Sequence, residues 1–390
     1  MNDFDAIIVG AGPMGLTFAA RLAGAGLRIA LVEQQPREAL ADPAFDGREI
    51  ALTHDSMRTL RDCDVWQHIP TAEVSPLRAA RVWNGASPYY MHIAKPGAEP
   101  EPLGSLVANH LIRRAAWERA SRESGVTMFC DARVVARELT QDGRAACVTL
   151  QGGRTLQAAL TVSADSRFSS TRRAAGISAT SKDFGRTMLV CRMHHAKSHH
   201  DVAWEWFDHG QTLALLPLNG GFCSSVVVTV AGHEAQRLLA MSEADFDADM
   251  ERRFQRRLGP MQLCSTRHAY PLVAVWAERF VAARHALIGD AAVGMHPVTA
   301  HGFNLGLRGA AALSRGILEA TARSADVGGA DLLVRYEREH RRFAWPLYTA
   351  TNALVKVYTA EAPPMRFARD ALLRAAGTFK PFRDAVAAML

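Results

Sequence analysis

The chain of 390 residues has few cysteines, few lysines and no long hydrophobic run. Its six cysteines are far apart and form no Cys-x-x-Cys pair. This spacing argues against a zinc site and a disulfide framework, and it indicates a reducing compartment. No apolar stretch reaches the roughly 18 residues that span a bilayer, and the acids of the opening MNDFDAIIVG do not suit an export signal. We therefore expect a cytoplasmic protein.

The charge pattern excludes a further class of partner. The formal net charge is +6, but nearly all of the 45 basic residues are arginine, and no basic run is interleaved with aromatic residues. We therefore expect no nucleic-acid partner. With 48% hydrophobic residues and a length well beyond one core of about 150 residues, the chain predicts a globular protein with two interlocked domains.

One histidine-rich run, HHAKSHH at residues 194–200, has the composition of a metal-binding cluster. The run is polar and loop-like, and its first neighbouring carboxylate is Asp201. A solvated turn is the favoured interpretation, so we expect no metal site.

The start of the chain carries the strongest motif. The apolar strand AIIVG leads into GAGPMG, a helical segment follows, and a second strand, RIALVE, ends in an acid. Gly10, Gly12 and Gly15 have the spacing of a dinucleotide-binding turn, in which they allow the tight turn, the approach of a pyrophosphate and the packing of the helix. Glu33 is placed to bind a ribose hydroxyl pair. This order predicts a nucleotide-binding βαβ unit.

A second motif far along the chain favours FAD over NAD. HALIGDAA reads as a strand that enters a Gly-Asp turn, and a helix rich in glycine and alanine follows. An NAD domain does not need such a turn. The carboxylate of Asp290 could bind the ribityl hydroxyls of a flavin, and the helix N-terminus could face its ring.

Together these motifs resemble the FAD-dependent aromatic hydroxylases, the group that contains p-hydroxybenzoate hydroxylase. GAGPMG with Glu33 matches the first signature of that group, VSADSRFSSTRR resembles the second, and GDAAVGMHPVTAHGFNLGL matches the third. DGREIALTHDSMRTL resembles the segment in which an arginine, here Arg48, contacts the cofactor. The second signature departs from the pattern, because Ser166 replaces a glycine, and this weakens the case for a reduced-nicotinamide contact there.

Within the group, the chain resembles the ubiquinone-biosynthesis hydroxylases of the UbiH/UbiF/UbiM type. The residues that carry this are the pair His296-Pro297, the run GFNLGL and the segment VANHLIRRAAWERA, while WEWFDHGQTLALLPL most resembles the UbiM branch. The resemblance implies a monooxygenase that hydroxylates the aromatic ring of a prenylated phenol or quinol through a flavin C4a-hydroperoxide. Its substrates would be that ring compound and O2, with NADH or NADPH as electron donor.

The resemblance also implies the site residues. Those expected to bind FAD are Gly10, Gly12, Gly15, Glu33, Arg48, Asn109, Asp165, Gly289, Asp290, Pro297, Gly302 and Asn304. His296 is the candidate catalytic acid or base, although a turn histidine whose ring binds backbone is the favoured alternative. Trp204 and Trp206 fall on one face of a strand, where they either line a quinone-like pocket or pack in the core.

The implied fold is α/β, with a Rossmann-like FAD-binding domain of the p-hydroxybenzoate hydroxylase type, a mixed-sheet substrate domain and a helical C-terminus. We expect the FAD-binding domain at residues 1–70, 100–180 and 275–330, the substrate domain at 71–99 and 181–274, and the helical segment at 331–390. A helix is expected over Ser242–Gly259, with Ser242 at its N-cap.

The end of the chain suggests a peripheral contact with the inner membrane. Residues 332–390 carry ten basic and five acidic side chains, and Phe379, Phe382, Val386 and Met389 recur at helical spacing. Packing on the FAD domain, or on a partner in a ubiquinone-biosynthesis complex, is the alternative. Two rival functions also remain open: another FAD-dependent oxidoreductase, of reductase or halogenase type, and a flavin-binding partner without catalysis.

Overall fold

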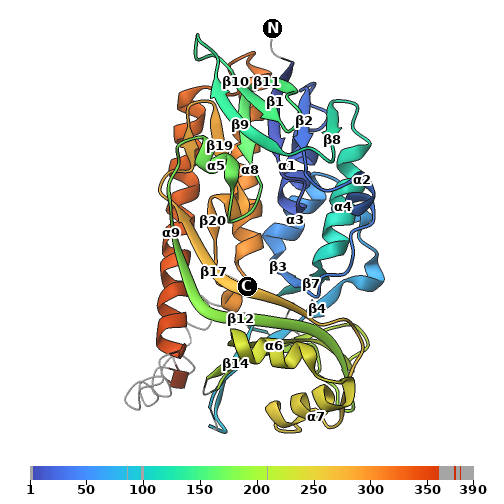
Figure 1. Cartoon of the computed structure of the whole chain (residues 1–390). Helices are drawn as coiled ribbons and strands as arrows, with labels where there is room; N and C mark the ends of the chain where they lie inside the picture. Colours follow the sequence, from blue (N-terminus) through green and yellow to red (C-terminus); the bar gives the residue numbers. More distant parts are fainter. Residues whose placement is uncertain are drawn as a thin grey trace.

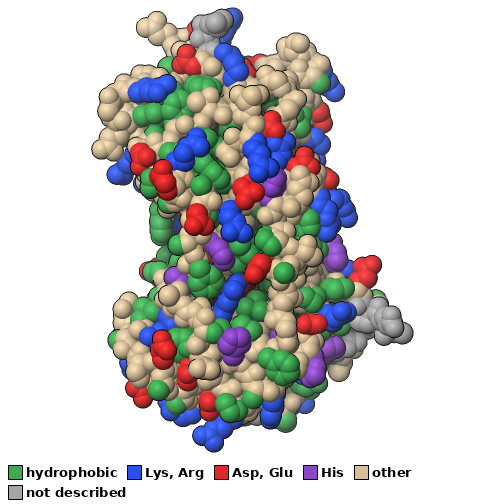
Figure 2. Space-filling model, turned by 90° about the vertical axis from the view of Figure 1, so that its right-hand side faces the viewer, with side chains coloured by type: hydrophobic (Ala, Val, Ile, Leu, Met, Phe, Trp, Pro, Cys, Tyr) green, Lys and Arg blue, Asp and Glu red, His purple; other side chains and the backbone are tan. Residues whose placement is uncertain are grey.

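The computed structural model describes residues 3–85, 87–97, 101–208, 210–359 and the single positions 373, 374 and 378. The molecule is elongated, with one sheet near the N-terminus and a second sheet at the opposite end (Figure 1). A small sheet lies between them. On the face shown in Figure 2, basic and acidic side chains are mixed rather than gathered into one patch of a single sign. None of the helices in the described residues has the length and apolarity that a bilayer span requires.

The first sheet has the strand order β18-β19-β11-β1-β2-β8, in which the strands from β19 to β8 are parallel and β18 is antiparallel to β19. The expected βαβ unit is confirmed, because β1 pairs in parallel with β2 on one side and with β11 on the other. The late strand predicted from HALIGDAA is β19, which joins the same sheet beside β11. The strands are β1 (Phe4–Val9), β2 (Ile29–Val32), β8 (Val126–Phe129), β9 (Val134–Leu139), β10 (Ala146–Leu150), β11 (Thr155–Ser163), β18 (Val281–Ala282) and β19 (His285–Leu287).

Helices cover this sheet and bury its apolar side chains in one continuous core. In that core α1 packs against α4 and α8, and α8 packs against α9. The helices outside the second sheet are α1 (Pro13–Leu22), α2 (Arg37–Ala41), α3 (His54–Asp62), α4 (Asn109–Ser121), α5 (Ser170–Ala174), α8 (Gly302–Ala322) and α9 (Ala330–Thr359), with short 3₁₀ turns η1 (Trp66–His68), η2 (Thr71–Glu73), η3 (Gly289–Ala291) and η4 (Pro297–Thr299).

A three-stranded antiparallel sheet connects the two ends of the molecule. It has the order β3-β7-β4, and its central strand β7 runs directly into α4. Its strands are β3 (Glu49–Leu52), β4 (Ser75–Leu77) and β7 (Gly104–Ala108).

The second sheet has nine strands, and its outer face is covered by α6 (Gly232–Ala240) and α7 (Glu243–Arg253), at the end of the molecule away from β1 and β2 (Figure 1). Trp204 and Trp206 pack in the core beneath these helices, so the strand that carries them turns them away from the small sheet. Of the two interpretations of these tryptophans, core packing therefore holds. The strands are β5 (Ala79–Asn84), β6 (Tyr90–Ala94), β12 (Ala179–His195), β13 (Val202–Asp208), β14 (Gln211–Pro217), β15 (Cys223–Ala231), β16 (Met261–Leu263), β17 (His268–Ala277) and β20 (Val293–Gly294).

The inner face of the second sheet, opposite α6 and α7, meets the small sheet through an apolar cluster. We call these residues the apolar cluster: Leu77, Met91, Ile93, Leu103, Ala203 and Leu373. Ala51 of β3 packs against it as a partly buried neighbour. The apolar cluster thus lies between the second sheet and β3, the strand that follows Arg48.

The helix predicted after Ser242 is present but shorter than expected. The helix expected over residues 242–259 begins as predicted, because the Ser242 side chain accepts a hydrogen bond from the backbone N–H of Asp245 (3.2 Å). It ends at Arg253 and not at Gly259, since Gln255 and Arg256 adopt positive φ angles that a helix does not allow.

At the C-terminus, α9 is followed by a few described positions. Leu373 is almost fully buried in the apolar cluster, and the guanidinium of Arg374 lies 5.0 Å from the ring of Tyr89. The predicted apolar stripe, which consists of Phe379, Phe382, Val386 and Met389, lies outside the described residues. The division of the chain into domains at the stated boundaries also stays a prediction.

Candidate FAD and substrate site

The glycine turn after β1 has the geometry that its motif predicts. Gly10 has a φ of +105°, and a Cβ there would lie 2.5 Å from the carbonyl oxygen of Ala164. A Cβ at Gly15 would lie 1.9 Å from the carbonyl oxygen of Gly10, so the start of α1 packs directly on the turn. A Cβ at Gly12, in contrast, would meet no protein atom within 4 Å. Gly10 and Gly15 are therefore needed for chain packing, whereas Gly12 borders open space.

Glu33 fixes the same turn from the end of β2. Its Oε2 accepts a hydrogen bond from the backbone N–H of Ala11 (2.7 Å), and its Oε1 accepts one from Gln35 (3.0 Å). Each carboxylate oxygen keeps a further lone pair that a ribose hydroxyl could use.

Arg48 and Asn109 meet at a carboxylate that the sequence did not single out. Asp46 accepts hydrogen bonds from Nη2 of Arg48 (2.6 Å) and from Nδ2 of Asn109 (2.7 Å). Burial tends to raise the pKa of Asp46, but the Arg48 hydrogen bond and charge, helped by Asn109, hold it below its usual range. Tyr270 of β17 completes the group, since its hydroxyl donates to the backbone oxygen of Asp46 (2.7 Å) and its ring lies 5.3 Å from the Arg48 guanidinium. Asp46 and Tyr270 thus fix Arg48 and Asn109 in place.

The carboxylate of Asp165 binds the start of the helix that follows it. Its carboxylate accepts hydrogen bonds from the Ser169 hydroxyl (2.5 Å) and from the hydroxyl of Thr171 (2.9 Å), at the start of α5. Ser166 has a φ of +79°, in the left-handed region that favours glycine, at the position where the resembling family has one. The backbone conformation of the motif is kept although the residue differs, while a cofactor contact of Asp165 stays a prediction.

The late Gly-Asp turn is held against the second sheet. Asp290 accepts a hydrogen bond from Nη2 of Arg167 (2.9 Å), and Nη1 of Arg167 donates to the backbone oxygen of Val273 (2.8 Å). The charge of Asp290 also contributes to raising the pKa of Arg48, after the larger effects of burial, which lowers it, and of Asp46, which raises it. The segment around Arg48 and the late Gly-Asp turn therefore come near each other.

Met14 connects the glycine turn to this late turn. A Cβ at Gly289 would lie 3.0 Å from Met14 Cγ, and one at Gly306 would lie 2.6 Å from Met14 Cε. The start of α1, the η3 turn and the first turns of α8 therefore converge.

Asn304 ties α8 to the small sheet. Its Oδ1 accepts from the backbone N–H of Thr53 (3.1 Å), and its Nδ2 donates to the backbone oxygen of Ala51 (2.8 Å). This places the N-terminus of α8, which begins at Gly302, beside the end of β3. Because its amide already binds the backbone, Asn304 positions these segments, and a direct contact with a flavin stays a prediction.

His296 has the geometry of a turn histidine. Its Nδ1 accepts a hydrogen bond from the backbone N–H of Val298 (3.2 Å) in the turn that Pro297 begins, and its ring meets Phe184 edge-on at 4.8 Å. Burial, with a smaller effect of Lys182, lowers the pKa of His296 to about 4. The ring is therefore neutral near pH 7, with its hydrogen on Nε2. The structural interpretation is favoured over acid catalysis, and a catalytic role remains untested.

Glu205 is a candidate site residue that the sequence reasoning missed. It alternates with Trp204 and Trp206 along β13, so its side chain lies on the inner face with that of Ala203. Its partners in the neighbouring strands are Val82 and Ala214. Burial raises its pKa to about 8, and among the described residues no hydrogen bond or ion pair reaches its carboxyl group. The strand alternation around WEWF was the signal that could have identified it.

These residues fit a bound dinucleotide. Gly12 borders open space, no side chain caps the first turn of α1, and the amides of a helix N-terminus favour a phosphate. Glu33 and Asp290 provide acceptors for hydroxyl groups on either side of that turn, and the apolar cluster lies beyond the small sheet. Fold and site together define the class of FAD-dependent monooxygenases of the p-hydroxybenzoate hydroxylase type.

Comparison with known proteins identifies the family. The FAD binding domain family matches residues 3–351, and the chain therefore belongs to this family. The chain is 45% identical to the ubiquinone hydroxylase UbiM of Neisseria meningitidis, over 99% of this chain and 84% of that protein. It is 36% identical to the ubiquinone hydroxylase UbiL of Rhodospirillum rubrum, over 94% of this chain and 84% of that protein.

A solved structure has the same fold. The p-nitrophenol 4-monooxygenase PnpA from Pseudomonas putida superposes with a TM-score of 0.79 at 18% identity, covering 99% of this chain and 97% of that one. The expected fold class is thereby confirmed, and the match to the FAD binding domain family confirms the expectation of FAD.

Proposed function

We propose that this FAD-dependent monooxygenase hydroxylates the aromatic ring of a prenylated phenol or quinol in ubiquinone biosynthesis. The observation that carries the proposal is the half-buried, unpartnered carboxyl group of Glu205, which lies beside the apolar cluster on the inner face of β13. The identity with UbiM and UbiL over nearly the whole chain supports the substrate class.

Reduced FAD, when bound, activates O2 so that one oxygen atom can be added to an electron-rich ring. Gly12 and the first turn of α1 would take the pyrophosphate, Glu33 the ribose, and Asp290 the ribityl chain. The network of Asp46, Arg48 and Asn109 would hold the flavin side of the cofactor, since its members fix one another's orientation without needing the cofactor.

The apolar cluster would border the ring and the first part of its prenyl tail. Its members come from the small sheet, from β5, β6 and β13 of the second sheet, and from the C-terminal part of the chain. Such a lining excludes water from the reacting atoms and attracts an apolar substrate. Ala51, whose backbone oxygen binds Asn304, borders both this lining and the start of α8.

Glu205 would bind the hydroxyl group of the ring. A carboxyl group without a partner in an apolar environment is costly, and a substrate hydroxyl would satisfy it. Because burial raises the pKa of Glu205 to about 8, most of the group holds its proton at neutral pH and can donate a hydrogen bond to the hydroxyl oxygen. The ionised form, whose share grows as the pH rises toward 8, can accept the hydroxyl proton, and a ring that gives up this proton is richer in electrons and is hydroxylated more readily.

The proposal extends to the electron donor and to the location of the enzyme. NADH or NADPH would supply the electrons. The C-terminal part of the chain would bring the enzyme to the membrane in which a prenylated substrate resides, or to other proteins of the pathway. The basic excess of residues 332–390 supports the former, and the burial of Leu373 in the apolar cluster supports a terminus that packs partly on the protein itself.

Product analysis tests the function. The chain is expressed in a bacterial strain that lacks its own ring hydroxylases, and its quinone extract is analysed by mass spectrometry. Restored ubiquinone, or an intermediate with one more hydroxyl group, is the expected result. A strain that accumulates the same unhydroxylated intermediates, although it contains yellow full-length protein, would favour another oxidoreductase or a flavin-binding partner.

A further inference from the structure

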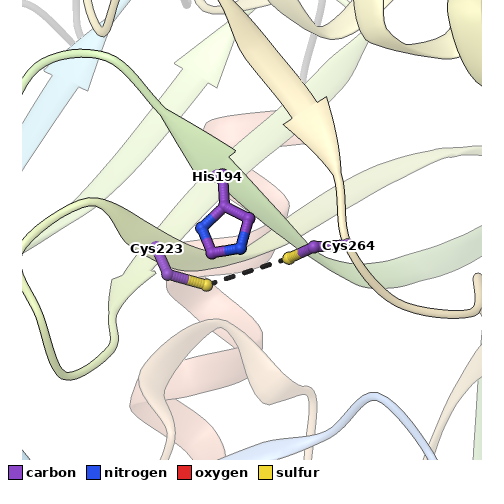
Figure 3. Close-up of side chains that lie close together, drawn as sticks. All are labelled: His194, Cys223 and Cys264. Atoms are coloured by element: carbon purple, nitrogen blue, oxygen red, sulfur yellow. Dashed lines mark hydrogen bonds between the residues drawn. The ribbon is translucent and has the colours of Figure 1, made fainter.

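Three side chains that lie far apart in the sequence meet on the second sheet, and none of them belongs to the candidate FAD site. They are His194, Cys223 and Cys264, and their ligand atoms all lie within 4.8 Å of one another. Figure 3 shows the imidazole of His194 above the two sulfur atoms, which are 3.9 Å apart. His194 and Cys264 are exposed and Cys223 is partly so, which leaves the group open to solutes.

The register of the sheet explains why they meet. Cys223 of β15 is the direct partner of His194 in β12. On the other side of β12, His194 is paired with Gln262 of β16, and the backbone N–H of Cys264 donates to the oxygen of Arg192 (3.0 Å). Partners in adjacent strands have side chains on the same face, so all three groups project from one face of the sheet.

The same register makes a disulfide between Cys223 and Cys264 unfavourable. The two cysteines lie on opposite sides of β12, which separates their backbones by two strand spacings, or about 9 Å. Disulfide-bonded residues have Cα atoms less than about 7 Å apart, so a direct bond would require the strands to move.

The spacing suits a shared metal ion instead. Zinc binds thiolates at about 2.3 Å in tetrahedral geometry, which places two sulfur ligands about 3.8 Å apart. The 3.9 Å between the two sulfur atoms agrees with that separation. An imidazole nitrogen is the usual third partner of such a sulfur pair, and His194 is in reach of both.

The other histidines of the HHAKSHH run do not take part. His195 binds the oxygen of Lys197 (2.7 Å) and the hydroxyl of Ser224 (2.9 Å) and is buried. His199 binds the backbone oxygen of Leu218 (2.9 Å) and is buried as well. These two histidines hold the segment from inside the fold, which differs from the solvated turn predicted from the sequence. The ligand atoms of His200 are not part of the group, so His194 is the histidine of the run that meets the two cysteines.

We propose that His194, Cys223 and Cys264 bind one zinc ion, with a water molecule at the fourth position. The ion would join β15, β12 and β16 at the edge where β16 ends. Arg192 lies two residues before His194 on the same face, and its Nη2 donates to Oε1 of Glu49 (2.6 Å), the neighbour of Arg48. A bound zinc ion would therefore stabilise the second sheet close to the residues expected to bind FAD. The inference does not depend on the proposed substrate.

Zinc titration of the flavin-loaded full-length protein tests the site. The protein is reduced, stripped with a chelator and titrated with zinc in competition with a chromogenic chelator. Wild type should bind one zinc ion per chain, and Cys223→Ser, Cys264→Ser and His194→Ala should each weaken binding at least tenfold. Cys147→Ser is the matched control, because Cys147 lies in β10 of the other sheet, and it should bind zinc like wild type.

A second measurement uses only wild type. Zinc should protect Cys223 and Cys264, and no other cysteine, from alkylation as read by peptide mass spectrometry. The proposal is overturned if zinc protects neither, if Cys223→Ser and Cys264→Ser bind as tightly as the control, or if the two cysteines form a disulfide in the metal-free protein.

Discussion

Replacing Glu205 by glutamine should make the protein more resistant to alkaline pH. The substitution keeps the shape of the side chain and removes its charge. Burial raises the pKa of Glu205 to about 8, from the 4.5 of an unperturbed glutamate. The folded state therefore holds the proton more tightly than the unfolded state. The contribution of the protonated Glu205 to the free energy of unfolding is complete below about pH 4.5 and is lost as the pH rises to about 8.

The size of the effect follows from the shift. Each pKa unit corresponds to about 1.4 kcal/mol, so the full shift sets an upper bound of about 5 kcal/mol. Glu205 keeps part of its surface accessible, which reduces the expected cost of ionisation to about 2–3 kcal/mol. With an unfolding entropy of about 2 cal/mol/K per residue, this corresponds to roughly 3 °C in Tm for a chain of this length.

Thermal unfolding of wild type and Glu205→Gln should be followed at half-unit steps from pH 5 to pH 9. The two Tm values should agree within error near pH 5, and the variant should be about 3 °C more stable near pH 8 to 9. Glu138→Gln is the control, because Glu138 is exposed in β9, and it should follow wild type at every pH. Parallel curves for wild type and Glu205→Gln would refute the burial of an unpartnered carboxyl group on the inner face. With a phenolic substrate, the same variant should raise KM or lower kcat near neutral pH.

Three further predictions concern the FAD-binding part of the molecule. Gly12→Val should abolish FAD binding while the apoprotein stays folded, because the new side chain meets no protein atom but fills the space beside α1; a folded variant that is still fully yellow would contradict this. Asp290→Ala should raise the FAD dissociation constant roughly ten- to a hundredfold, through loss of a charged hydrogen bond of about 1.5–3 kcal/mol, and an unchanged constant in a fluorescence titration would limit Asp290 to its contact with Arg167. Asn304→Ala should lower the stability by about 1–3 kcal/mol, because it leaves backbone groups of β3 and the following turn without partners, and a Tm equal to that of wild type would show that α8 is held by packing alone.

The nucleotide-binding part of the fold could be predicted from the sequence because its constraints are local. The turn after β1 needs glycine at Gly10 for its positive φ, and at Gly15 because a side chain would collide with the turn. Such requirements leave a fixed spacing in the chain. The late Gly-Asp turn was identified in the same way, since Gly289 also has a positive φ, of +58°.

The remaining site residues depend on tertiary contacts that leave no spacing. Asp46 was recognised only from its contacts with Arg48 and Asn109. The alternation around WEWF places Glu205 opposite the two tryptophans, but only the packing of α6 and α7 shows which face of β13 is covered. The sequence likewise gave no sign that His194 would meet two distant cysteines, because strand pairing brings them together. The absence of a Cys-x-x-Cys pair excludes a local zinc motif but not a site assembled across strands.

Isotope labelling tests the central claim most directly. The purified yellow protein is mixed with NADH or NADPH and a short-chain prenylated phenol or quinol, under ¹⁸O2 in ordinary water. The account predicts a product with one added hydroxyl group that carries one ¹⁸O atom, formed only when reductant, O2 and protein are all present. Reductant consumption with no labelled product, or a product whose added oxygen comes from water, would contradict it.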